Sequence, residues 1–172
     1  MSTLIKNGTV VTNAEIFQAD LWVENGVIQS ISDHFNSTPD RIIEASNQTI
    51  FPGGVDLHCH VADNYTAGMI AAACGGTTCI VEPSVQKKGC GLVSTLDEWQ
   101  EKAANACAID YGYHITVYDA HDNLLEDMPE TVRRGVSSYK IFLTSFPGNP
   151  RVSDADTLHV MQRVSQNGGL MV

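Results

Sequence analysis

From Pro52 onward the sequence alternates short apolar segments with helix-forming segments, and this alternation restricts the fold more than any other feature. The expected strands cover residues 55–60, 77–81, 113–118, 138–143 and 170–172. Four β/α units and the start of a fifth predict a parallel sheet, either doubly wound or forming half of a (β/α)8 barrel. Because the chain ends inside the fifth strand, we expect the half-barrel.

Local signals place the helices between these strands. Asn64 can cap an alanine-rich helix that the Gly75-Gly76 pair ends. Thr95 and Glu98 form a capping box for the next helix, and a short helix follows at 130–134. A last helix is expected to begin after its cap. The cap is Ser153, and the apolar stripe consists of Leu158, Met161 and Val164.

The first fifty residues have a different pattern, with short extended segments and Asn-Gly turn signals. Asn7-Gly8 is expected to interrupt a strand at 4–11, and Asn25-Gly26 to join two short strands. We therefore expect two parts: a small β-sandwich segment over residues 1–51, and an incomplete TIM-like α/β barrel of the metal-dependent hydrolase type over residues 52–172.

Composition excludes several classes of partner. Twenty acidic and ten basic residues give the 172-residue chain a net charge of −10, which argues against nucleic acid or an anionic membrane surface. No apolar run approaches the roughly 20 residues that span a bilayer. The five cysteines form an odd set without a C-x-x-C motif and are expected to be reduced. A cytoplasmic protein that acts on a small molecule is therefore expected.

His58 and His60 are the strongest candidate site residues. On a strand, residues at i and i+2 point to the same face, so the two imidazoles would lie side by side while Cys59 points away. Two neutral imidazoles on one element provide half of a metal site. The alternative is that both are ordinary strand residues.

Lys140 is the third candidate, because it interrupts an otherwise apolar strand. A bare ammonium is costly to bury, so this side chain needs a partner or a function. Three explanations remain open at this point. The amine can form a Schiff base, it can be carboxylated by carbon dioxide into an anionic metal ligand, or its head can extend to the strand end.

Three motifs in order resemble the dihydropyrimidinase/D-hydantoinase family of the cyclic amidohydrolase superfamily. They are FPGGVDLHCH at 51–60, GGTT at 75–78 and SYKIFL at 138–143. The resemblance covers essentially the whole chain and implies the N-terminal portion of such a protein, with a β-sandwich segment beside a barrel.

The resemblance also implies a site and a reaction. His58 and His60 would bind one of two zinc ions, and carboxylated Lys140 would bridge both, as ligand and catalytic residue. A metal-bound hydroxide would open a dihydropyrimidine or hydantoin ring to an N-carbamoyl amino acid. In the family, later histidines and an aspartate complete the site, so the isolated chain is expected to be inactive. A homo-oligomer is also implied, because the family forms tetramers.

Three departures from the family pattern concern the substrate. Ser145 stands where hydantoinases usually carry a substrate-contacting tyrosine, and the 61–64 loop is short. Ala62 replaces the arginine expected of a dihydroorotase. The alternative is therefore a non-catalytic, dihydropyrimidinase-like scaffold. A Schiff-base lyase ranks last, because it leaves the histidine pair unexplained.

The remaining polar residues are weaker candidates. Asp119, His121 and Asp122 follow the third strand and are considered for substrate contact. Asp56 is expected either to orient His58 or to cap backbone amides. Glu82 receives no role. The histidines read as surface or packing residues are His34, His114 and His159.

Overall fold

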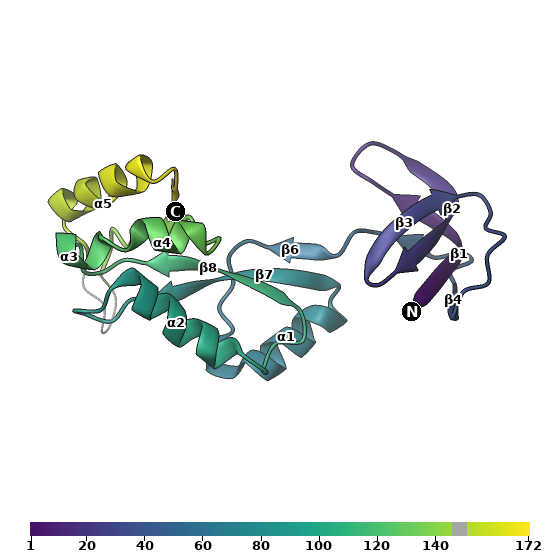
Figure 1. Cartoon of the computed structure of the whole chain (residues 1–172), viewed down its shortest axis with the longest axis horizontal. Coiled ribbons are helices and arrows are strands. Elements are labelled where there is room, and N and C mark those ends of the chain that lie inside the picture. The colour runs from purple at the N-terminus through teal and green to yellow at the C-terminus, as the bar shows by residue number, and fades with distance from the viewer. Residues whose placement is uncertain (146–150) are drawn as a thin grey trace. The chain divides into compact units, whose positions relative to one another are not determined.

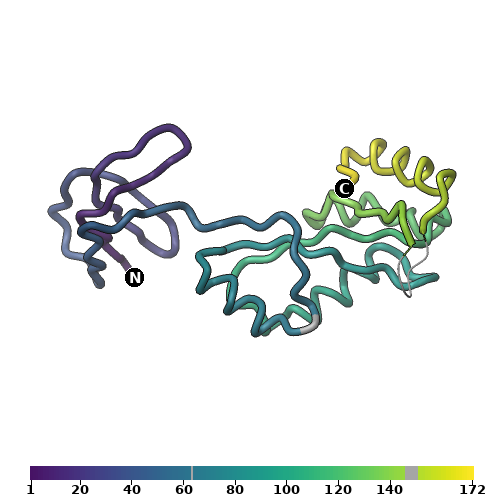
Figure 2. Tube along the Cα trace, turned by 180° about the vertical axis from the view of Figure 1, so that it is seen from behind, coloured from purple at the N-terminus to yellow at the C-terminus, as the bar shows by residue number. Residues whose placement is uncertain are grey.

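The computed structural model describes residues 1–145 and 151–172, and the chain divides into two compact units, Met1–Gly53 and Gly54–Val172 (Figures 1 and 2). No helix in the described ranges is long and apolar enough to cross a membrane. The two units differ in strand pairing and are described one at a time.

The first unit is one five-stranded sheet. Its strands are β1 (Ser2–Val11), β2 (Ile16–Glu24), β3 (Val27–Ser32), β4 (Arg41–Glu44) and β5 (Thr49–Ile50). The order is β3-β2-β1-β4, with β5 also paired to β1; the β1–β2 and β2–β3 pairs are antiparallel, and β4 and β5 run parallel to β1. A small buried cluster on this sheet contains Val10, Ala19 and Leu21. The described residues of this unit therefore form a single sheet, and the β-sandwich over residues 1–51 stays a prediction.

The two Asn-Gly signals have different outcomes. Asn25 (φ 51°) and Gly26 (φ 80°) form the tight turn between β2 and β3, as expected. Asn7 (φ 60°) makes no turn: β1 continues through it, and the register with β2 shifts between Ile5 and Gly8. The predicted break is therefore a β-bulge. Its amide is satisfied from outside β1, because Asn7 N donates to Asp20 Oδ1 at 2.8 Å.

The second unit contains a parallel sheet whose strands lie in sequence order. They are β6 (Gly54–Asp56), β7 (Thr77–Val85), β8 (Asp110–Thr116), β9 (Ser138–Lys140) and β10 (Leu170–Met171). A doubly wound sheet reverses its strand order at a switch point, whereas a barrel does not. The unreversed order and the curl of the sheet therefore identify a half-barrel; a complete barrel is not present in the described residues.

The helices connect successive strands, and α1 and α2 lie along the same side of the sheet (Figure 1). They are the short 3-10 helix η1 (Ala62–Asn64), α1 (Tyr65–Cys74), α2 (Leu92–Ala103), α3 (Asp122–Leu125), α4 (Met128–Arg133) and α5 (Asp154–Gln166). Two predicted caps are confirmed: Asn64 accepts from Ala67 N at 3.0 Å, and Ser153 from Asp156 N at 3.1 Å. The core contains Met69, Ile80, Leu96, Ile115 and Val160.

The predicted capping box at Thr95 is wrong. Helix α2 begins at Leu92, so Thr95 lies inside it and donates to Gly91 O at 2.8 Å. The cap comes from elsewhere in the chain: the Asp127 carboxylate accepts from Leu92 N at 3.2 Å and from Val93 N at 2.9 Å. A carboxylate at a helix N-terminus satisfies free amides and favours the helix dipole.

The predicted apolar stripe of α5 is only partly correct. Val164 is buried as expected, but Leu158 is 57% exposed and Met161 49% exposed. Val160, four residues before Val164, is the second buried residue of this helix. The inner face of α5 is therefore set by the i, i+4 pair that packs against the core.

Candidate metal centre

His58 and His60 lie just after β6, not within it. The strand ends at Asp56, so the expected strand through His60 is wrong. The Asp56 carboxylate accepts from His58 N at 3.0 Å, a local turn bond that draws the backbone out of the ladder. Cys59 N still donates to Val81 O at 3.2 Å, which keeps the segment beside β7. The histidine rings remain neighbours, with centroids 5.3 Å apart and planes at 75°.

Lys140 is the last residue of β9, at the same end of the sheet. Its Nζ lies 2.9 Å from His58 Nε2, although the two residues are 82 positions apart in the chain. The Phe142 ring lies on another side of this ammonium, with its centroid 4.6 Å from Nζ. The strand prediction through residue 143 was too long, so Lys140 reaches the strand end. The structure thus brings all three predicted site residues together.

The electrostatics of this cluster favour a neutral His58. Partial burial, followed by the neighbouring Lys140 cation, His60 and His114, holds the pKa of His58 below its usual value. Burial also lowers the pKa of Lys140. An ammonium only donates, so the His58 Nε2 lone pair accepts this bond. The same lone pair is the one that a metal ion takes from imidazole.

The donor set fits a metal site of the implied kind. Among the described residues there is no group of three or more His, Cys, Asp or Glu side chains that could hold a metal. His58 and His60 therefore need a different type of third ligand. Lys140 meets this need only when carboxylated, because a carbamate replaces the ammonium with anionic oxygens beside His58.

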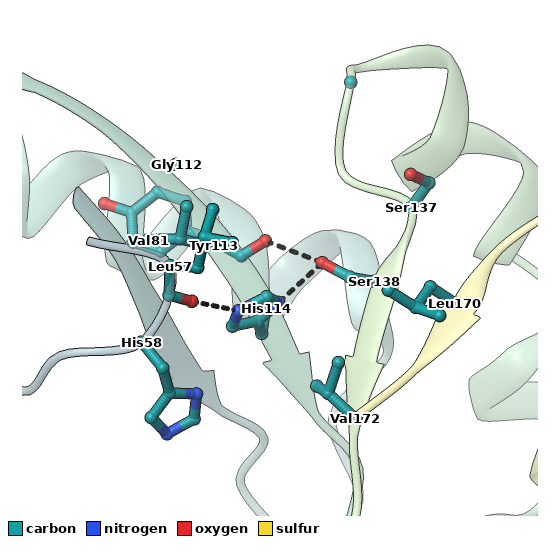
Figure 3. Close-up of a pocket in the computed structure, with 11 residues that line it drawn as sticks. Leu57, His58, Val81, Gly112, Tyr113, His114, Ser137, Ser138, Leu170 and Val172 are labelled. Carbon is teal, nitrogen blue, oxygen red and sulfur yellow. Dashed lines mark hydrogen bonds between the residues drawn. The ribbon is translucent and has the colours of Figure 1, made fainter. Parts of the chain in front are cut away.

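His114 organises the centre, a role that the sequence prediction missed by assigning it to surface or packing. Its Nε2 lies 2.7 Å from Leu57 O, so this nitrogen carries the proton, and Nδ1 lies 2.6 Å from Ser138 Oγ (Figure 3). The ring also stacks on His58, with centroids 5.6 Å apart. His114 therefore ties β8 and β9 to the segment before His58. One feature of the sequence could have indicated this role: His114 is a polar residue between Tyr113 and Ile115 in an apolar stretch of the strand.

A pocket of about 520 Å³ opens beside these residues (Figure 3). It is lined by Leu57, His58, His114, Ser138, Leu170 and Val172, among others. His58 and His114 contribute imidazoles to a largely apolar lining. Of the three predicted site residues, His58 alone lines this pocket among the described residues.

Comparisons with known proteins give the relationship. No family model matches the chain. The D-hydantoinase of Rhizobium radiobacter is 36% identical over 181 residues, covering 100% of this chain and 39% of that protein. The D-hydantoinase of Streptomyces coelicolor is 37% identical, covering 99% and 39%. The chain is related to the N-terminal portion of the D-hydantoinase and dihydropyrimidinase family. The resemblance inferred from the sequence motifs is confirmed.

Solved structures of D-hydantoinase and dihydropyrimidinase share the fold. A D-hydantoinase structure superposes with a TM-score of 0.93 at 36% identity, covering 99% of this chain and 39% of that one. The dihydropyrimidinase from Brevibacillus agri NCHU1002 also gives 0.93, at 34% identity with the same coverage. The chain thus spans about two-fifths of the length of these hydantoinase relatives.

Other polar residues of this hydantoinase-like unit hold loops together. The buried Gln86 side chain accepts from Tyr118 N and Asp119 N, both at 2.9 Å, and donates to Cys90 O at 2.7 Å. Asp119, a candidate for substrate contact, accepts from Gly89 N at 3.1 Å and lies 3.1 Å from His121 Nδ1. These contacts give Gln86 and Asp119 a structural role.

Proposed function

We propose that the protein containing this chain hydrolyses a cyclic amide, opening a hydantoin or dihydropyrimidine ring to an N-carbamoyl amino acid. The 2.9 Å contact between Lys140 Nζ and His58 Nε2, with the His60 ring beside it, carries this proposal. A scaffold has no physical need to bring two imidazoles and a lysine together at the end of a barrel sheet. The similarity to D-hydantoinases supports the same reaction class.

The proposed roles follow from the chemistry of the three side chains. His58 and His60 would supply imidazole nitrogens to the zinc ions, and Lys140, once carboxylated, would supply anionic oxygens. Carboxylation joins the neutral amine nitrogen to the carbon of carbon dioxide and releases a proton, so the lowered pKa of Lys140 favours it. When bound, such ions lower the pKa of a coordinated water and polarise a carbonyl oxygen.

The residues around the ligands fix their positions. His114 donates to Leu57 O and packs on His58, so it restrains both the backbone and the ring of that ligand. Phe142 covers the Lys140 head and stacks on Tyr118 with an interplanar angle of 2°. This aromatic pair leaves the lysine amine one polar neighbour, His58 Nε2, among the contacts of the described residues.

The partners and compartment remain proposals. We propose a small cyclic amide as the substrate, no nucleic acid or membrane partner, and a homo-oligomeric assembly like that of the family. We also propose a cytoplasmic location, supported by five cysteines that are all free thiols.

A chimaera tests the function, because the chain superposes on the corresponding part of D-hydantoinase. In it, residues 1–172 replace that part, and hydantoin and dihydrouracil hydrolysis is measured with zinc present. We expect ring opening that His58→Ala abolishes and His34→Ala, outside the centre, leaves unchanged. The 172-residue chain alone should show no turnover. A folded, zinc-loaded chimaera without hydrolysis would contradict the proposal.

The second candidate is a non-catalytic scaffold, and one observation favours it. Ser145, at the position of the usual substrate-contacting tyrosine, accepts from Arg151 N at 3.1 Å and is engaged within its own loop. The phenolic side chain of the usual tyrosine is therefore absent at this position, and the shorter serine hydroxyl bonds Arg151 N instead. The inactive outcome of the chimaera experiment would support this candidate.

A further inference from the structure

Glu82 is a buried charge without a role in the site described so far. Glu82 lies in β7 and is only 1% exposed. One carboxylate oxygen, Oε1, accepts from Val61 N at 2.8 Å and from Ala62 N at 2.7 Å. These are the two amides that directly follow His60, so the charge is directed at the ligand segment.

Two consecutive residues of β7 hold the backbone on both sides of His60. Val81 O accepts from Cys59 N at 3.2 Å before it, and Glu82 Oε1 accepts from the two amides after it. We propose that Glu82 is a positioning residue that keeps the His60 ring against His58. The consequence for metal binding rests on the proposed function, whereas the restraint on His60 does not.

Burying the Glu82 carboxylate costs desolvation free energy, as its surroundings show. The second oxygen, Oε2, and the hydroxyl of the neighbouring Tyr65 are both buried, and neither makes a hydrogen bond of standard geometry among the described residues. Burial and then the nearby Glu82 carboxylate raise the pKa of Tyr65. A buried carboxylate is unfavourable unless strong bonds offset its desolvation. Here the offset comes from short charge-assisted bonds to the segment after His60.

The test uses the 172-residue chain, purified without metal, and three variants of Glu82 that are compared with it by NMR. Glu82→Leu removes the acceptor, Glu82→Gln keeps a carbonyl oxygen, and Glu82→Asp withdraws the carboxylate by one methylene. Thr131→Val is the matched control, because Thr131 is fully buried and bonded to Met128 O at 2.9 Å, away from His60. The readouts are amide exchange at Val61 and Ala62, the nuclear Overhauser effect between the His58 and His60 rings, and Co²⁺ affinity from its absorption spectrum.

We expect Glu82→Leu to lose the exchange protection and the ring-to-ring effect, and Co²⁺ affinity to fall about 10- to 100-fold. Glu82→Gln should recover much of each, and Thr131→Val should retain all three. If Glu82→Leu does not fold, Glu82→Asp should show smaller losses in the same direction.

Two outcomes separate this proposal from the proposed function. A folded Glu82→Leu or Glu82→Asp variant with the wild-type ring-to-ring effect and affinity would overturn the positioning role. A wild-type chain that shows the effect and its loss in Glu82→Leu, but binds no Co²⁺, would uphold the positioning role and contradict metal binding by His58, His60 and Lys140 in this chain.

Discussion

The two units of the chain bury different kinds of side chain. The sheet of Met1–Gly53 has a small apolar cluster, and Asp20 is its one buried charged or polar side chain among the described residues. The unit Gly54–Val172 has a larger apolar core and also buries Glu82, Gln86, His114, Thr116 and Thr131, among others.

This difference places most of the buried polar side chains of the described residues in the second unit. Buried polar groups lower stability unless they are hydrogen-bonded. A unit that buries several of them therefore needs hydrogen-bond partners for them. In the second unit, Glu82 and His114 bond the backbone around His58 and His60, and Gln86 bonds the loop after β8. The first unit has no comparable arrangement in its described residues. Its single buried carboxylate, Asp20, satisfies a bulge amide.

The largest expected effect is a loss of stability in one unit that leaves the other unit unchanged. Ile115→Ala removes a fully buried side chain from the second unit and should lower its free energy of unfolding by about 2–5 kcal/mol. Amide exchange in β1 and β2 should not change. Leu21→Ala, in the cluster of the first unit, should show the reverse pattern. Equal loss of protection in both units from either substitution would contradict their independence.

The next effect tests the polar network of the second unit. His114→Phe keeps a ring to stack on His58 but leaves Leu57 O and Ser138 Oγ without this partner. We expect a loss of about 1–3 kcal/mol by denaturant unfolding. Ser138→Ala removes only one of these bonds and should cost less. If both variants are as stable as the wild type, the network does not stabilise the fold.

A smaller effect tests the cap of α2. Asp127→Ala should cost about 0.5–2 kcal/mol, because Leu92 N and Val93 N lose their acceptor. Glu98→Gln, which changes only the exposed pairs with Lys87 and Lys102, should stay within about 0.5 kcal/mol. A larger loss of stability in Glu98→Gln than in Asp127→Ala would support the capping box of Thr95 and Glu98 that the sequence predicts.

The smallest effect is a change in titration. His58 should titrate below the free-histidine value of about 6.5, and Lys140→Met should raise its pKa by removing the neighbouring cation. Because the folded pKa of His58 is depressed, its contribution to stability is present above the unfolded pKa and is lost as the pH falls through the folded pKa. Histidine NMR titration measures the His58 pKa in the wild type and in Lys140→Met. An unchanged His58 pKa in Lys140→Met would show that Lys140 does not act on this ring.

The sequence predicts what short-range patterns control. Asn64 and Ser153 were identified as caps because each bonds an amide three residues away. Asp127 was missed because it caps a helix start 35 positions earlier in the chain.

The same limit applies to the centre itself. His58, His60 and Lys140 were selected by residue type and motif, and the fold brings them together. Glu82 and His114 act through backbone groups 21 and 57 positions away, which no local pattern specifies. Candidate ligands can therefore be selected from the sequence, whereas the buried residues that bond the backbone around them are found only in the structure.

The most direct test of the proposed centre is ¹³C NMR of the 172-residue chain with ¹³C-bicarbonate and zinc, combined with zinc measurement by equilibrium dialysis. We predict a carbamate resonance that Lys140→Arg abolishes, and zinc binding that depends on His58, His60 and Lys140. Zinc bound equally well by the triple variant His58→Ala/His60→Ala/Lys140→Arg, with no carbamate in the wild type, would contradict the metal centre.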